Sequence, residues 1–251
     1  MSIVTDFAPG GFRYVNGVFQ YSCGVAALPG FEIERVRFFR PMPLAAGFAA
    51  IESHIQARGR PMTAFCACEL RSPEPFSEAG FKAFNEIYVG TLSRWGLYRD
   101  GINPVARSNV CPEVHAPREP SFYGFSYTVP APAGLRRASF VIAGSAECPE
   151  GKGNYRDHII RRGDTSPSGL LEKARWVLGE HERRMGALGV GWADTTGVHV
   201  YTVHDIHPLI GSELAQRGAA ESGLSWHFCR PPVVELEFEM DMRGLARELV
   251  I

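Results

Sequence analysis

Two polar side chains fall within apolar surroundings and could bind a small molecule. Arg107 interrupts the apolar run VARSNV, which is typical of a strand, and a guanidinium there can hold a carboxylate by two parallel hydrogen bonds. Asn85 lies one helical turn from Phe81 and Tyr88, so it faces the core if those rings do. Its amide could donate to a carbonyl oxygen or hold a water molecule. The alternatives are a structural ion pair for Arg107 and a solvent-facing amide for Asn85.

Acidic side chains gather near the C-terminus of the chain. Residues 233–242, VVELEFEMDM, alternate between apolar and acidic types, which predicts a strand with Glu235, Glu237 and Glu239 on one face. These carboxylates could act on protons or water, or they could form a solvated strand face. The segment 121–129, SFYGFSYTV, also reads as a strand but contains no acid.

The histidines and cysteines do not form a recognisable metal site or nucleophile. His199, His204 and His207 lack the spacing of a standard zinc motif. Cys111 shares a strand face with Arg107 and Asn109, but its sequence surroundings favour a buried thiol. We therefore expect no metal and no cofactor.

The composition is that of an ordinary globular protein. The 251 residues are 45% hydrophobic and 21% charged, which allows a sizeable core. A net charge of -1 gives no drive toward nucleic acid or anionic membrane, and the arginines at 35, 37 and 40 are expected on a solvated face. No signal peptide and no apolar run of ~18 residues is visible, which predicts a cytoplasmic protein with reduced cysteines.

The first half of the chain predicts a hairpin followed by alternating helices and strands. Residues 12–27 favour two strands around Asn16-Gly17, the strongest short hairpin signal. A helix is expected over 44–58, then a buried strand over 63–70. Ser77 can cap a helix that reaches Gly96. Two further strands are expected, over 105–114 and 121–129.

The second half repeats this order, which indicates an internal duplication. The expected elements are a strand over 138–146, a helix that starts near Pro167, a strand over 196–203, a helix over about 208–217 and the strand over 233–242. TAFCACELRSPEP at 63–75 aligns with TGVHVYTVHDIHP at 196–208. The Pro- and Gly-rich stretch 130–137 is the expected linker, so we predict domains over 1–130 and 131–251.

An ordered series of segments resembles the RidA (YjgF) family of small trimeric proteins. In the second half the resemblance lies in FVIAGSAE at 140–147, the Gly-Asp helix entry at 163–164, VHVYTVHDI at 198–206 and RPPVVELEFEMDM at 230–242. In the first half it lies in YSCGVAALPG at 21–30, FKAFNEIY at 81–88 and NPVARSNV at 103–110. No single segment is as specific as a phosphate-binding loop, but the series covers most of the chain.

The resemblance implies an α+β fold of two tandem RidA-like (chorismate-mutase-like) repeats, each a mixed sheet backed by two helices. It also implies a homotrimer with clefts between subunits and hydrolytic deamination of a small enamine or imine that carries a carboxylate. A 2-aminomuconate deaminase type, which would act in aromatic degradation, is one form of this reading. The alternatives are a chorismate-type hydrolase or lyase on a duplicated scaffold and a non-catalytic metabolite-binding module.

The resemblance also assigns roles to individual residues. Arg107 matches the family's carboxylate-binding arginine, and Asn85 matches the Asn-Glu-x-Tyr helix. Tyr14 and Ser22 match the hairpin residues that line the family's cleft, whereas Tyr21 is expected in the core. Asn109 stands where the family often has cysteine.

The acid is the main departure from the family pattern. The family's closing strand carries a glutamate that orients water, yet the first half has none there and the second half lacks a match to Arg107. We therefore expect a composite site in which Arg107 acts with Glu237, while Glu69 and Glu113 are other candidates for the acid. Arg71 or Arg13 could anchor a second carboxylate.

Overall fold

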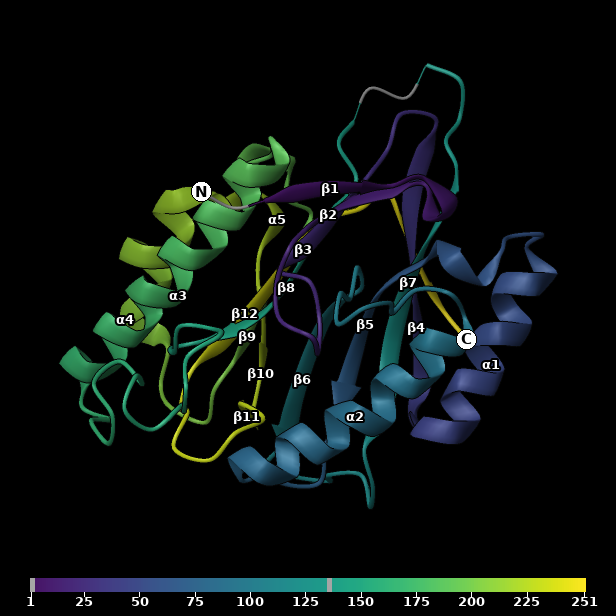
Figure 1. Ribbon diagram of the computed structural model, residues 1–251. Helices are drawn as coiled ribbons and strands as arrows, with labels where there is room; N and C mark the ends of the chain where they lie inside the picture. Colours follow the sequence, from purple (N-terminus) through teal and green to yellow (C-terminus); the bar gives the residue numbers. More distant parts are fainter. Residues whose placement is uncertain (1–2, 135–136) are drawn as a thin grey trace.

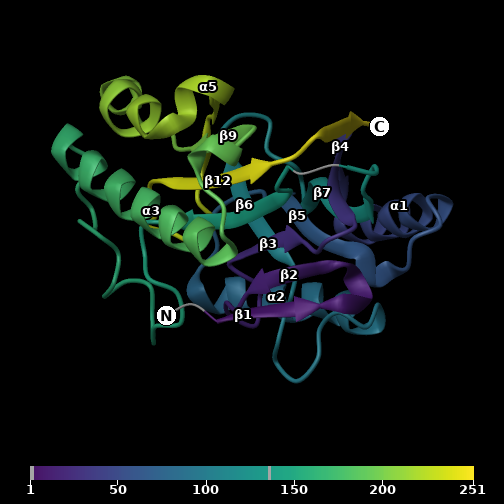
Figure 2. The same ribbon diagram turned by 90° about the horizontal axis from the view of Figure 1, so that it is seen from above.

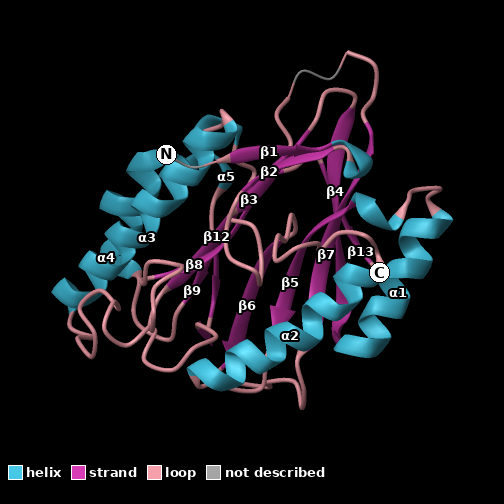
Figure 3. Cartoon of the chain, viewed as in Figure 1, coloured by secondary structure: helices cyan, strands magenta, loops and turns pink. Residues whose placement is uncertain are grey.

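The computed structural model describes residues 3–134 and 137–251. The chain forms four layers. Two β-sheets lie face to face, with helices on both outer sides (Figure 1). Figure 2 shows the same layers from above, with α3 and α5 on one side of the strands and α1 on the other. Figure 3 shows that long loops run below the strands on the side of α3. In the described part of the chain, no helix is long and apolar enough to cross a membrane.

The six-stranded sheet has the order β11-β6-β5-β7-β4-β13. In chain order its strands are β4 (Phe31–Pro43), β5 (Phe65–Arg71), β6 (Ala106–Pro112), β7 (Ser121–Pro130), β11 (Cys229–Arg230) and β13 (Arg247–Val250). Two helices cover its outer face, α1 (Leu44–Ala57) and α2 (Glu78–Arg94). As predicted, Ser77 caps α2, because its hydroxyl accepts a hydrogen bond from the amide of Gly80 at 3.1 Å.

The seven-stranded sheet has the order β1-β2-β3-β8-β12-β9-β10. Its strands are β1 (Val4–Phe7), β2 (Phe12–Val15), β3 (Gly24–Ala27), β8 (Phe140–Ala146), β9 (Gly197–Tyr201), β10 (Ser225–His227) and β12 (Glu239–Gly244). The helices beside it are α3 (Pro167–Leu188), the short α4 (His207–Leu209), the π-helix η4 (Ile210–Ala219) and α5 (Ala220–Ser222). Single 3₁₀ turns occur at η1 (Ala8–Gly10), η2 (Met62–Ala64) and η3 (Trp192–Asp194).

The two sheets share a pattern of strand pairing. In the order β4-β7-β5-β6, the first two pairs are antiparallel and the last is parallel. The order β8-β12-β9-β10 has the same directions. A duplication would produce this pattern, and the superposition of the two halves stays a prediction.

Both sheets contain strands from both sides of residue 130. The hairpin β2–β3 joins the seven-stranded sheet through the pair β3–β8, and β13 joins the six-stranded sheet beside β4. A division at residue 130 therefore does not coincide with the division into sheets. Two residues of the expected linker 130–137, at 135 and 136, lie outside the described residues.

Two strand predictions need correction. The closing strand begins at Glu239 rather than 233, because Glu235 has a left-handed φ of 70° that interrupts the extended chain. The long strand β4 was not expected, since its charged residues suggested a solvated face. Arg35 of β4 is instead buried between the sheets, where it binds Glu69 through two hydrogen bonds of 2.5 and 2.9 Å.

Side-chain alternation divides apolar from polar layers in β12. Met240 and Met242 pack among the apolar residues of α3, including Val177 and Leu178. Asp241, on the opposite face of β12, accepts a 2.6 Å hydrogen bond from Ser108 of β6. The space between the sheets is therefore unusually polar for a protein core, and some of its charged groups, such as Arg35 and Glu69, are paired with one another.

Candidate functional site

A pocket opens where strands β6 and β8 approach each other, and both halves of the chain line it. Its polar lining comes from Tyr21, Arg107, Asn109, Glu150, Tyr155 and Glu239. Phe81, Val233 and Leu236 add an apolar wall. A hollow with both polar and apolar walls suits a small molecule that carries both kinds of group.

Arg107 is a buried cation that has no anionic partner in the part of the chain that the structure describes. The residue is 3% exposed, and in the described residues no carboxylate lies within ion-pair distance of its guanidinium. Its Nη1 donates to Asn85 Oδ1 at 2.5 Å, and its guanidinium carbon lies 4.9 Å from the ring centre of Tyr88 and 5.3 Å from that of Tyr21. A buried charge of this kind is costly unless an anion meets it, so the pocket is suited to a carboxylate.

Two asparagines support this end of the pocket. Asn85 is fully buried on α2, and its Nδ2 donates to the carbonyl oxygen of Phe81 at 2.7 Å, which directs its Oδ1 toward Arg107. Asn109 lines the pocket itself. Its Oδ1 accepts a hydrogen bond from Ser72 at 2.9 Å, while its buried Nδ2 has no partner in the described residues. That free amide donor can serve the same ligand oxygen as Arg107.

Glu239 supplies a buried acid. It is 3% exposed, and within residues 3–134 and 137–251 its carboxyl group makes no hydrogen bond or ion pair. Burial, and then the charge of Asp241, raise the pKa of Glu239 well above its usual range, although Arg107 acts in the opposite direction. A side chain at Gly144 would overlap Glu239 Oε1, so this glycine makes room for the acid.

Two tyrosines and a second glutamate form the opposite wall. Burial is the main cause that raises the pKa of both Tyr21 and Tyr155, so their hydroxyl groups are neutral donors. In the part of the chain that the structure describes, neither hydroxyl has a hydrogen-bond partner. Glu150 lies beside them and binds Arg184 at 2.8 Å.

Five of the suggested site residues do not line this pocket, and the first of them, Asn85, acts on it only through its contact with Arg107. Glu237 lies apart from it and binds His204 Nε2 at 2.8 Å. Tyr14 belongs to the apolar core cluster that also contains residues of α1 and α2. The Ser22 hydroxyl donates to the carbonyl oxygen of Pro104 at 3.0 Å. Arg71 lies between the sheets, 4.1 Å from the ring centre of Tyr123.

The other candidate acids and ligands are engaged elsewhere. Burial would raise the pKa of Glu69, but Arg35 holds it at about 2. Glu113 pairs with Arg230 at 2.7 Å, and Arg13 pairs with Asp6 at 3.1 Å. The six cysteines are free and buried, and burial raises the pKa of Cys111. In the described residues no group of His, Cys, Asp and Glu could hold a metal ion.

The sequence did not single out several residues that line the pocket. Glu239 was one of three alternating glutamates, and periodicity alone could not distinguish it from Glu237. Glu150 and Tyr155 come from the long loop between β8 and α3, where no periodic pattern exists. Tyr21 was expected in the core, but the long turn between β2 and β3 brings it to the pocket.

Comparison with known proteins shows likenesses in both sequence and fold. Residues 4–249 match the family described as 2-aminomuconate deaminase CnbZ. A 2-amino-5-chloromuconate deaminase of Comamonas testosteroni is 55% identical over 245 residues, which cover 98% of each chain. A crystal structure of a chorismatase matches with a TM-score of 0.52 and 11% identity, over 91% of this chain and 78% of that one.

The fold and the pocket define an α+β protein with two mixed sheets and a polar pocket where strands β6 and β8 approach each other. The likeness to the chorismatase concerns the fold alone, and it agrees with the expected chorismate-mutase-like architecture. The chain belongs to the 2-aminomuconate deaminase CnbZ family. The 2-aminomuconate deaminase type that the sequence suggested is thus confirmed, while the wider resemblance to RidA stays a prediction.

Proposed function

We propose that this protein hydrolyses a 2-aminomuconate-type enamine to the corresponding 2-oxo acid and ammonia. The observation that carries the proposal is the shared pocket of a buried, unpaired Arg107 and a buried carboxylic acid, Glu239. Family membership and the 55% identical chloromuconate deaminase support the same substrate class. A chorismate-type reaction has no such support, because the chorismatase resembles this chain in fold alone.

In the proposed complex, Arg107 and the free amide of Asn109 bind the carboxylate next to the reacting carbon. A guanidinium can hold both carboxylate oxygens, which fixes the plane of the conjugated chain. The free hydroxyls of Tyr21 and Tyr155 are placed to donate to other polar groups of the substrate. Arg71, once expected as a second anchor, lies outside this pocket.

Glu239 is the proposed general acid and base. The proton of Glu239 passes to the enamine carbon. The C=C electron pair forms the new C–H bond, and the nitrogen lone pair forms the C=N bond of an iminium ion. The Glu239 carboxylate then takes a proton from a water molecule while the water oxygen bonds to the C=N carbon. The electron pair of the C=N bond returns to nitrogen. Reprotonation of nitrogen by Glu239 lets the C–N bond break. Ammonia leaves with the bonding pair, and the hydroxyl proton returns to Glu239 as C=O forms.

The direct test is ammonia release from 2-aminomuconate generated in the assay. Because this compound also hydrolyses without an enzyme, the rate is compared with a protein-free reaction and with Glu239→Gln. The wild type should release one ammonia per 2-oxo acid formed, and Glu239→Gln should lose about 100-fold or more, the scale of general acid–base catalysis. Wild-type ammonia release at the protein-free rate would overturn the proposal.

A further inference from the structure

Glu150 is a second carboxylate in the pocket, and its surroundings differ from those of Glu239. Its side chain is 18% exposed, and its Oε1 accepts a 2.8 Å hydrogen bond from Arg184 Nη2. Its Oε2 accepts a hydrogen bond of 3.3 Å from the Cys23 thiol. Among the described residues Glu239 has no such partners, so the pocket contains an ion-paired carboxylate and an acid of a different kind.

Arg184 fixes Glu150 relative to the pocket wall. This arginine of α3 is fully buried, and its Nη1 donates to the carbonyl oxygen of Ala143 at 3.1 Å in β8, the strand that continues into the lining at Gly144 and Ser145. Its Nε donates to Glu180 at 3.1 Å. Since helix, strand and loop all hold this guanidinium, the position of Glu150 is set by the folded core rather than by the loop that carries it.

Glu150 also lies at the border between the pocket and a neighbouring surface hollow. That hollow is formed by residues 18–21 and by residues 149–152, 154 and 155. It shares Tyr21, Glu150 and Tyr155 with the pocket. Glu150 therefore forms part of the wall of both spaces.

We propose that Glu150 binds the substrate nitrogen and that Arg184 is its positioning residue. This proposal rests on the deaminase function above. The nitrogen becomes cationic twice during the reaction, first as the iminium ion and then as it is protonated before departure. A fixed carboxylate that stays ionised throughout stabilises both states without reorganisation, whereas Glu239 gains and loses the proton that moves during the reaction. Arg107 recognises the carboxylate of the substrate, and Glu150 distinguishes an amino acid from the same acid without nitrogen.

The test compares a ligand that carries nitrogen with one that does not. The kcat/KM for 2-aminomuconate is measured by ammonia release, and the inhibition constant is measured for muconate, an unsaturated dicarboxylate without nitrogen. Glu150→Gln should lower kcat/KM by about 100-fold, the scale for one lost electrostatic contact to a transition state. Its inhibition constant for muconate should stay within about threefold of the wild type or fall, because an anion no longer faces an anionic ligand.

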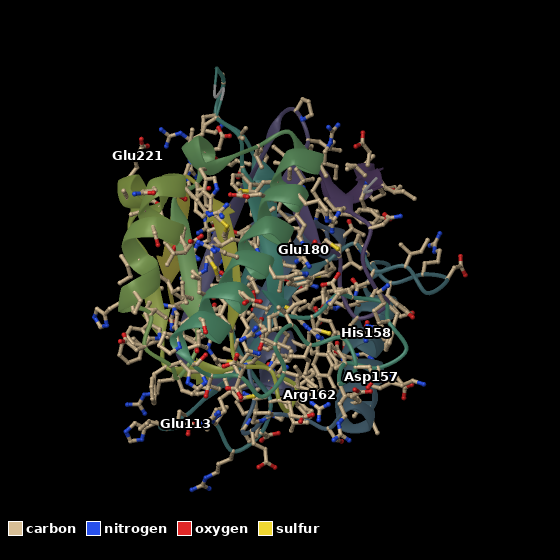
Figure 4. All side chains as sticks on the ribbon, turned by 90° about the vertical axis from the view of Figure 1, so that its left-hand side faces the viewer. Glu113, Asp157, His158, Arg162, Glu180 and Glu221 are labelled. Atoms are coloured by element: carbon tan, nitrogen blue, oxygen red, sulfur yellow. The ribbon has the colours of Figure 1, made fainter. Side chains whose placement is uncertain are left out.

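Glu180→Gln is the matched control, because it also removes a carboxylate partner of Arg184 but does not line the pocket. Figure 4 shows Glu180 on α3, above the loop that carries Asp157, His158 and Arg162. This variant should keep kcat/KM within about threefold of the wild type. Glu150→Asp keeps the charge, so it should retain more activity than Glu150→Gln and provides a second variant if the amide folds poorly.

Three outcomes decide the proposal. A selective loss of kcat/KM in Glu150→Gln, with muconate inhibition unchanged or tighter, supports it. Equal losses for both ligands in Glu150→Gln, or equal effects of Glu150→Gln and Glu180→Gln, would show that Glu150 serves only as a structural partner of Arg184. An inactive wild type would instead reject the deaminase function itself.

Discussion

Arg107 Nη1 donates to Asn85 Oδ1 at 2.5 Å, and this bond connects strand β6 to helix α2. The amide of Asn85 cannot turn freely, because its Nδ2 donates to the carbonyl oxygen of Phe81. The helix thus sets the direction of a guanidinium that has no other hydrogen-bond acceptor in the described residues. The remaining donors of Arg107 are left for a ligand.

Substitution of Asn85 should therefore affect activity through Arg107. Asn85→Ala frees the guanidinium, and we expect kcat/KM to fall by about tenfold, as for one lost hydrogen bond to a charged group. Asn85→Asp should be worse, because its carboxylate would pair with Arg107 and compete with the substrate. Steady-state ammonia release measures both, with Gln56→Ala on the surface of α1 as the control. An Asn85→Asp variant at least as active as Asn85→Ala would contradict this role.

Glu239 should make the folded protein less stable as the pH rises. Its folded-state pKa is raised above the unfolded value of about 4.3, so the native protein keeps a proton that the unfolded chain releases. Stability from this group is fully present below about pH 4.3 and is lost as the pH rises toward the folded-state pKa. Glu239→Gln lacks this dependence.

The melting temperature measures this effect. The melting temperature of Glu239→Gln minus that of the wild type should be larger at pH 8 than at pH 5, because only the wild type loses stability over this range. The variant should also lose activity. A difference in melting temperature that stays constant over this range would show that the buried carboxyl group does not titrate as the structure indicates.

The pair Arg35–Glu69 should behave as a unit between the sheets. Arg35→Met leaves Glu69 buried without its two hydrogen bonds, which should cost about 3–5 kcal/mol of the free energy of unfolding. Glu69→Gln in the same chain should recover part of that loss, since no unpaired charge remains. Denaturant unfolding of the wild type, both single variants and the double variant gives the coupling energy. Additive losses would contradict the pairing.

We expect the protein to form a homotrimer. The RidA resemblance predicts this assembly, and strand β10 adds a physical reason. It is an edge strand that carries the 38% exposed Trp226, and the 51% exposed Phe228 follows it. Light scattering at micromolar concentration should give a mass three times that of the chain, and a monomer would count against the prediction.

Local patterns in the sequence were enough to predict most of the elements. The apolar spacing over 44–58 gave α1, and the Ser77 cap gave the start of α2. Strand β4 was missed because Glu32, Glu34 and Arg35 are charged yet buried, and only tertiary ion pairs make such burial possible. The association of β1–β3 with β8 depends on contacts between distant segments, which no local pattern specifies.

The site was predictable where regular elements carry it. Arg107 and Asn85 lie on a strand and a helix whose facing sides follow from periodicity, and the structure brings them into contact. Glu237 was expected as the acid, but a regular strand over 233–242 offers no way to distinguish it from Glu239. The left-handed Glu235 breaks that regularity, so only the later glutamate lies in β12 and reaches the pocket.

The most direct test of the central claim is ammonia release by variants of Arg107. Arg107→Ala removes the carboxylate anchor and should cost ~2–5 kcal/mol, or about 30-fold to several thousand-fold in kcat/KM. Arg107→Lys should recover little, because an ammonium group lacks the planar fork. The account predicts that Arg107→Ala loses kcat/KM while the variant still folds cooperatively. It is contradicted if Arg107→Ala melts early yet releases ammonia from 2-aminomuconate at the wild-type rate per folded molecule.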